Sequence, residues 1–128
     1  MSETDVRLGG LMQIAVNAKD VVRAAAFYRD ALGLKFLFDA PGLAFFDSGG
    51  VRLMLARPER PDLDHPSSVL YFRVGNIEDA HRALASRGVV FLTKPHVVHR
   101  AEDYDLWLAE FRDSEENILA LASEVRRG

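Results

Sequence analysis

The sequence contains no cysteine, and this absence excludes disulfide bonds and any metal site built on thiolate ligands. No apolar run approaches the roughly 20 residues of a membrane-spanning helix, and the polar opening segment, residues 1–9, has neither the basic nor the apolar region of a signal peptide. The net charge is −3, and basic residues gather only at Arg126 and Arg127, which gives no footprint for nucleic acid. We therefore expect a cytoplasmic protein that binds neither membranes nor nucleic acid.

What is present fits one small globular domain. The chain has 128 residues, of which 48% are hydrophobic and 27% charged, close to the averages of folded domains. Residues 1–9 carry no periodic pattern, so we expect a flexible tail there and a single domain over residues 10–128. Three prolines mark residues 58–67 as a linker. This linker separates module one, residues 10–57, from module two, residues 68–124.

The two modules repeat one order of elements. In module one, apolar periodicity predicts a strand, a helix and three strands, at residues 11–16, 20–33, 35–38, 43–46 and 51–56. Module two repeats this order at residues 69–74, 77–87, 89–93, 106–111 and 117–122. Asp47 maps onto Asp113 with an offset of 66, but Gly33 maps onto Gly88 with an offset of 55, so residues 94–105 contain an insertion. The sequence therefore predicts a duplicated βαβββ unit around a shared pocket.

Three segments resemble the vicinal-oxygen-chelate superfamily of glyoxalases, bleomycin-resistance proteins and dioxygenases. They are Gln-Ile-Ala-Val-Asn-Ala-Lys-Asp at 13–20, Phe-Tyr-Arg-Asp-Ala-Leu-Gly-Leu at 27–34 and Phe-Arg-Asp-Ser-Glu-Glu-Asn at 111–117. The resemblance covers about residues 10–124 and implies an α+β fold, in which two βαβββ modules form a curved mixed sheet around a central pocket. The third segment departs from the family's usual Asp-Pro-x-Gly-Asn, because Glu116 stands in the place of glycine. If Glu116 must adopt the positive φ that glycine tolerates, this turn is strained by about 1 kcal/mol; otherwise the turn has changed type.

The resemblance also implies a place for one divalent metal, held by a His or Gln on the first strand of each module and a Glu on each last strand. These four positions fall on Gln13, Met54, Val69 and Ala120. A thioether is a poor ligand for hard divalent ions, and the valine and alanine side chains cannot coordinate. We therefore expect no metal and no cofactor. Gln13 is then either an ordinary polar residue or a contact to a ligand.

The pocket should be lined by the strand faces that turn away from the helices. Alternation assigns ten residues to that face: Gln13, Ala15, Arg52, Met54, Val69, Tyr71, Arg73, Ile118, Ala120 and Ala122. If the hairpin turns have even lengths, Leu43, Phe45, Trp107 and Phe111 join them. From this set we predict seven ligand-binding residues: Gln13, Arg52, Met54, Tyr71, Arg73, Trp107 and Phe111. Two guanidinium groups in a cavity imply an acidic or oxygen-rich ligand, unless they pair with the protein's own carboxylates.

The insertion at residues 94–105 is polar, and it could form a lid over the pocket. Its His96 is the best candidate for a catalytic acid or base, because imidazole titrates near neutral pH. His96 and His99 should point to opposite faces of an extended chain, and the alternative is that both are half-exposed loop residues without a role. They offer no evident metal site.

These observations favour a protein that binds a small organic, acidic molecule in its inter-module pocket without the family metal. The alternative is an enzyme, a lyase, dioxygenase or isomerase, that uses unidentified metal ligands or His96 without metal. A third hypothesis is a domain that serves mainly as a dimer or partner module. The exposed strand edges of βαβββ units lead us to expect a homodimer.

Overall fold

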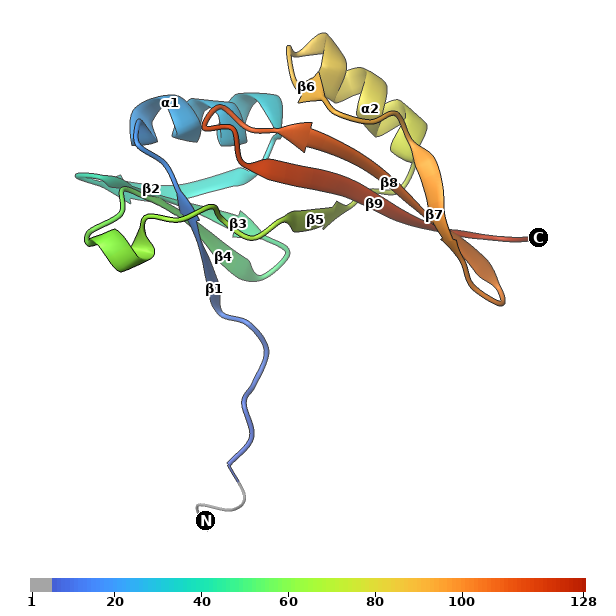
Figure 1. The fold of residues 1–128 in the computed structure, drawn as a ribbon, viewed down its shortest axis with the longest axis horizontal. Helices are drawn as coiled ribbons and strands as arrows, with labels where there is room; N and C mark the ends of the chain where they lie inside the picture. Colours follow the sequence, from blue (N-terminus) through green and yellow to red (C-terminus); the bar gives the residue numbers. More distant parts are fainter. Residues whose placement is uncertain (1–5) are drawn as a thin grey trace.

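The computed structural model describes residues 6–128, so the tail expected at residues 1–9 lies partly outside the described residues. The chain folds as the predicted α+β arrangement of two modules, each with one sheet covered by one helix, and both helices lie on the same side of the molecule (Figure 1). No helix among residues 6–128 is long and apolar enough to cross a membrane.

Module one carries its strands in the order β1-β4-β3-β2, with β1 parallel to β4 and the other pairs antiparallel. The strands are β1 (Gln13–Asn17), β2 (Lys35–Ala40), β3 (Leu43–Ser48) and β4 (Val51–Ala56). The helix α1 (Val21–Ala26) begins after Asp20, whose carboxylate accepts the N–H of Arg23 at 3.0 Å and so caps the first turn. The proline-rich linker contains a single 3₁₀ turn, η3 (Pro61–Leu63).

Helix α1 continues into a π-helical turn, η2 (Phe27–Ala31), in which the N–H of Leu32 bonds to the carbonyl of Phe27 at 3.1 Å. A π turn accommodates one extra residue in a helix. The sequence contains that extra residue, because Gly33 follows the cap Asp20 by thirteen positions, whereas Gly88 follows the cap Asn76 by twelve. The π turn therefore absorbs a length difference between the two modules.

Module two has the sheet order β5-β9-β8-β6, and β7 also pairs with β8. Its elements are β5 (Leu70–Arg73), α2 (Ile77–Ser86), β6 (Val90–Phe91), β7 (His96–Arg100), β8 (Tyr104–Arg112) and β9 (Ile118–Arg126). Because β6 and β7 pair with successive parts of β8, together they take the place of one strand of module one. The insertion thus lengthens a hairpin, and the interpretation of residues 94–105 as a lid is wrong. Figure 1 shows this hairpin projecting away from module one, beside the C-terminus.

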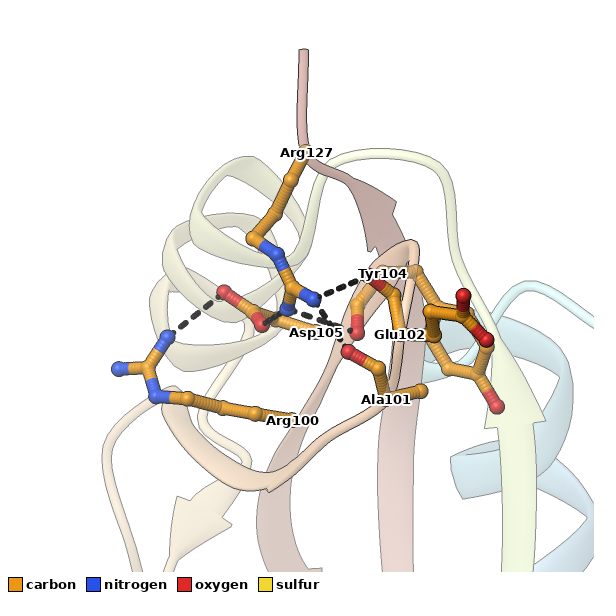
Figure 2. A network of polar contacts seen from close by, with 6 residues as sticks. All are labelled: Arg100, Ala101, Glu102, Tyr104, Asp105 and Arg127. Carbon is orange, nitrogen blue, oxygen red and sulfur yellow. Dashed lines mark hydrogen bonds and ion pairs between the residues drawn. The ribbon is translucent and has the colours of Figure 1, made fainter.

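Arg127 holds the end of that hairpin (Figure 2). Its guanidinium donates to the carbonyls of Glu102 at 2.6 Å and Tyr104 at 3.2 Å, and also contacts the carbonyl of Ala101. The Asp105 carboxylate, only 14% exposed, lies between Arg127 and Arg100 and pairs with both. The C-terminal residues therefore fix the turn at the tip of the hairpin.

The core lies between the helices and the sheets. Its largest fully buried side chains come from the helix-facing side of the strands and from the first helix: Tyr28, Phe46, Phe111, Leu53, Leu55, Leu119 and Val16. The other side of each sheet carries no helix. We call that side the open face of each module, and it is where the alternation predicted the pocket.

Candidate functional site

Three side chains, those of Gln13, Arg52 and Met54, form a cluster on the open face of module one, which we call the Arg52 cluster. The parallel register of β1 and β4 places Gln13 beside Arg52. The Nε of Arg52 donates to Oε1 of Gln13 at 2.7 Å, and Nε2 of Gln13 lies 3.7 Å from Sδ of Met54. The Arg52 guanidinium also lies 5.5 Å from the ring centroid of Phe45, whose ring stacks on Phe38 at 4.4 Å. The Gln13 amide and the Phe45 ring thus fix the position of the Arg52 guanidinium.

Arg52 has no carboxylate partner within ion-pair distance among residues 6–128. Its cross-strand neighbour is Asp47, but that carboxylate accepts the N–H of Gly50 at 3.2 Å in the β3–β4 turn. The guanidinium is partly buried, and only one of its five N–H donors goes to Gln13. Toward residues 6–128, Arg52 therefore presents free donors, with a positive charge, on the open face.

A pocket of about 320 Å³ lies next to this cluster. Its floor is the open face of module one, with Ala15, Leu43 and Met54, and its wall is the linker, including Leu63 and His65. Asn17 holds the linker in place, because its Nδ2 donates to the carbonyls of Leu63 at 2.8 Å and His65 at 2.7 Å. The lining also includes Arg57 and Glu59, which are of opposite charge, and Arg52 lies outside it, beyond Met54 and Gln13. The site thus combines a mostly apolar hollow with a few polar groups, as small-molecule sites usually do.

The predicted arginine of module two is engaged differently. Arg73 lies on the open face of β5 and pairs with Glu124 at 2.9 Å, and its hydrogen bond lowers the pKa of that carboxyl below its ordinary value. The alternative of an ion pair within the protein is therefore realised at Arg73. Tyr71, on the same face, is 58% exposed. Tyr71, Arg73 and Phe111 line a cavity between the modules that includes none of Gln13, Arg52 and Met54, so the part of the chain that the structure describes does not bring the two arginines into one pocket.

Trp107 and Phe111 lie on the helix-facing side of β8 and not on the open face, where the sequence placed them. Phe111 pairs with Leu119 and is fully buried in the core, against which Trp107 also packs. The assumption of an even hairpin turn is wrong, since Arg112 pairs with Ile118 and five residues stand between them. An odd count exchanges the two faces of the strand.

The same register brings a residue that the sequence reasoning missed onto the open face of module two. Glu110 pairs with Ala120, one strand away from the position of the family's glutamate. The distance along the chain between Glu110 and Ala120 could have indicated that they are paired. It does so only if the turn between their strands is known to hold five residues. Glu110 is the carboxylate of β8 that shares the open face with Tyr71.

His96 and His99 both lie on this open face, and the expectation of opposite faces is wrong. His96 pairs with Leu108 and His99 with Leu106, because a β-bulge lies between Val97 and His99. His96 is exposed, and its Nδ1 lies 2.7 Å from the carbonyl of Lys94. Residues 6–128 contain no group of three or more His, Asp or Glu side chains that could hold a metal ion.

The four family metal positions do not form a cation site. Gln13 supplies one amide oxygen, which already accepts a hydrogen bond from the positively charged Arg52, and Met54 supplies a thioether. Val69 and Ala120 supply no donor, and Ala120 is fully buried. A divalent ion at Gln13 would meet a guanidinium and no carboxylate, so these residues do not fit the metal.

The residues that carried the family resemblance join the two modules. The Tyr28 hydroxyl donates to Oδ2 of Asp113 at 2.6 Å, and burial together with this carboxylate raises the pKa of Tyr28 far above its ordinary value. Oδ1 of Asp113 accepts the N–H groups of Glu115 at 2.8 Å and Asn117 at 2.9 Å. Nδ2 of Asn117 reaches back to the carbonyl of Asn17 at 3.0 Å. Asp113 therefore organises the β8–β9 turn and attaches it to module one.

The same turn also caps the first helix. The Glu115 carboxylate accepts the N–H groups of Lys19 at 2.6 Å and Asp20 at 3.2 Å, at the positive end of α1. Glu116 adopts φ 68°, the one positive φ at a non-glycine residue among residues 6–128, so the strained turn is realised and not a changed turn type. The departure from the family's glycine is thus a strained position in a structural turn, remote from the Arg52 cluster.

Comparisons with known proteins agree with this architecture. A sequence model of the Glyoxalase/Bleomycin resistance protein/Dioxygenase superfamily matches residues 10–121. Solved structures with the same fold include a protein from the mobile metagenome of V. pseudocholerae, with a TM-score of 0.77 at 20% identity over 92% of this chain and 96% of that one.

Two further structures extend this likeness. A superfamily member from Sphaerobacter thermophilus has a TM-score of 0.75 at 20% identity over 91% of this chain and 98% of that one. A lactoylglutathione lyase from Agrobacterium tumefaciens has a TM-score of 0.70 at 24% identity over 91% and 94%. At these identities the likeness concerns the fold, while the sequence match defines the family. The chain therefore belongs to the glyoxalase/bleomycin resistance protein/dioxygenase superfamily.

Proposed function

We propose that this protein binds a small organic acid on the open face of module one and does so without a metal ion. The observation that carries the proposal is Arg52, a partly buried guanidinium with free donors, held by Gln13 and Phe45. Partial burial of a cation without a carboxylate has a desolvation cost, and an incoming carboxylate offsets that cost. The donor set at the family metal positions supports binding without metal.

The arrangement predicts how such an acid would lie. Its carboxylate would meet Arg52, whose planar fork forms paired hydrogen bonds with carboxylates. Its apolar part would enter the hollow lined by Leu43, Met54 and Leu63. The guanidinium would supply orientation and the hollow would supply most of the buried area.

We also propose that a second copy of the chain covers the open faces. The edge strands β1 and β5 each pair with one neighbour only, and the exposed apolar side chains of the open faces include Phe38, Val69 and Tyr71. A dimer would bring the Arg52 cluster of one protomer against another sheet and narrow the pocket. Light scattering after size-exclusion chromatography tests this, since a mass of 14.3 kDa at working concentration would contradict it.

A second candidate function is catalysis at the open face of module two. Glu110 and His96 share this face and could act as proton acceptors, and Glu110 lies beside the position of the family's glutamate. The related fold of a lactoylglutathione lyase makes such chemistry a reasonable assay target. Turnover that is lost in Glu110→Gln but kept in Arg52→Gln would favour this candidate over simple binding.

Binding by metal-free protein tests the main proposal. After dialysis against a chelator, the protein is screened by thermal shift against aromatic carboxylates and their matching primary amides. The acids should raise the melting temperature and the amides should not. Losing the charged hydrogen bonds in Arg52→Gln should weaken the best acid by about 10- to 100-fold.

Arg29→Gln is the matched control, because Arg29 lies on the first helix, outside both cavities, and already pairs with Asp30 at 2.9 Å. Its affinity for the acid should stay within about twofold of the wild-type value. The proposal is wrong if Arg52→Gln leaves the affinity unchanged, or if binding appears only with a stoichiometric divalent metal.

A further inference from the structure

A second cavity, of about 490 Å³, lies between the two modules and shares no lining residue with the pocket beside Arg52. Its floor is apolar and includes Phe72, Leu84, Phe111 and Leu121 from module two. Its rim carries Lys35 and Asp47 from module one and Arg73 from module two. Cavities of this size accommodate small organic ligands.

The internal repeat explains why this space is open. Tyr28 stands eight residues after the cap of the first helix, and Leu84 stands eight residues after the cap of the second. Asp47 is likewise the counterpart of Asp113, at an offset of 66. At one contact between the modules, Tyr28 reaches across and donates to Asp113. At the contact that the repeat makes equivalent, Leu84 stands in the place of the tyrosine and Asp47 in the place of the aspartate. The cavity lies between these two residues.

The charges at the rim favour an anion. Lys35 forms no ion pair among residues 6–128, whereas Arg73 is already paired with Glu124. The carboxylate of Asp47, the cross-strand neighbour of Lys35, accepts the N–H of Gly50. With Glu124 counted, the charges around the cavity balance, so the attraction for an anion comes from the ammonium of Lys35, which no carboxylate among residues 6–128 holds in an ion pair.

We propose that this cavity is a second ligand site, which binds a small monoanionic amphiphile with its apolar part on Phe72 and Leu84 and its head group at Lys35. It is independent of the acid site at Arg52. An aryl sulfonate or a carboxylate with an aromatic or aliphatic body has the required chemistry, because burial of the body on the floor adds to the attraction at the rim.

The probe is 8-anilinonaphthalene-1-sulfonate, an aromatic monoanion whose fluorescence rises in apolar surroundings, and N-phenyl-1-naphthylamine is its uncharged counterpart. Titrations should show saturable binding of both probes. Leu84→Tyr copies the residue of the closed contact and fills the cavity, so it should weaken both probes by at least about 10-fold. Leu84→Met, which conserves volume, should stay within about threefold of the wild type. If Leu84→Tyr does not fold, Ser48→Trp fills the cavity from the opposite wall.

Lys35→Gln separates charge from shape. It should weaken the sulfonate by about three- to tenfold and leave the uncharged probe unchanged. Unchanged affinity of both probes in the cavity-filling variants would overturn the proposal, and so would an equal effect of Lys35→Gln on both. Arg52→Gln distinguishes the two sites, because loss of the sulfonate in this variant but not in the cavity-filling ones would place the probe at Arg52 and also overturn the second site.

Discussion

Replacing Tyr28 by phenylalanine removes one hydroxyl from the contact between the modules. That hydroxyl donates to Asp113 at 2.6 Å, and both residues are buried. A hydrogen bond to a charged acceptor contributes about 1.5–3 kcal/mol to stability. Asp113 keeps its bonds from Glu115 and Asn117 in the variant. We therefore expect the lower half of that range, about 2 kcal/mol.

Urea denaturation at about pH 8 should show this loss as a lower midpoint with an unchanged m-value, and the melting temperature should fall by about 6–8 °C. Tyr71→Phe is the matched control, because Tyr71 is 58% exposed and its substitution should change stability by less than about 0.5 kcal/mol. A Tyr28→Phe protein as stable as the wild type would refute the structural role of this hydroxyl.

Alkaline pH provides a second, independent test of the same contact. Burial, and then the charge of Asp113, raise the pKa of Tyr28 in the folded protein above its ordinary value of about 10. The unfolded chain then loses its proton first, so the contribution of Tyr28 is fully present below about pH 10 and declines by about 1.4 kcal/mol per pH unit above it. The stability difference between wild type and Tyr28→Phe should therefore shrink from about pH 10 upward. A difference that stays constant to about pH 11 would contradict this assignment.

Two further substitutions test the turns. Glu116→Gly relieves a positive φ of 68° and should raise the free energy of unfolding by about 0.5–1 kcal/mol, whereas Glu116→Ala keeps the strain and should not; urea denaturation of both variants distinguishes strain from loss of the side chain. Arg127→Gln removes the donors that hold Ala101, Glu102 and Tyr104, so limited proteolysis should cut within residues 100–105 several times faster, with the melting temperature changed by less than about 3 °C. Unchanged cleavage would show that the strand pairing alone holds the hairpin.

The sequence predicted the duplicated modules because apolar alternation and helix caps are local signals. The assignment of Gln13, Arg52, Met54 and Tyr71 to the open face follows from period-two alternation alone, and the register agrees with it. The contact between Tyr28 and Asp113 joins residues 85 positions apart, and no local pattern indicates it. Both residues belong to segments that resemble the family, but the resemblance alone does not show that they join the two modules.

The wrong predictions arose where one extra residue in a turn or bulge decides which face of the strand a side chain takes. The turn at residues 113–117 lacks a glycine that would mark its centre, so the sequence did not indicate that the turn has an odd number of residues. Trp107 and Phe111 were therefore assigned to the wrong face of their strand. The bulge after Val97 has no sequence mark either, and it moved His99. In both places hydrogen-bond registry across the sheet decides which face a side chain takes, and registry depends on the partner strand.

The π turn of the first helix has a consequence for how the chain tolerates changes in length. Deleting one residue within Phe27–Ala31 can convert that turn into ordinary α-helix, with the cap at Asp20 and the left-handed Gly33 both retained. Deleting one residue from β4 would instead exchange the remaining side chains of that strand between the core and the open face. A change of one residue in length should thus destabilise the protein far more in a strand than in the first helix. The first helix is where the length of a module can vary.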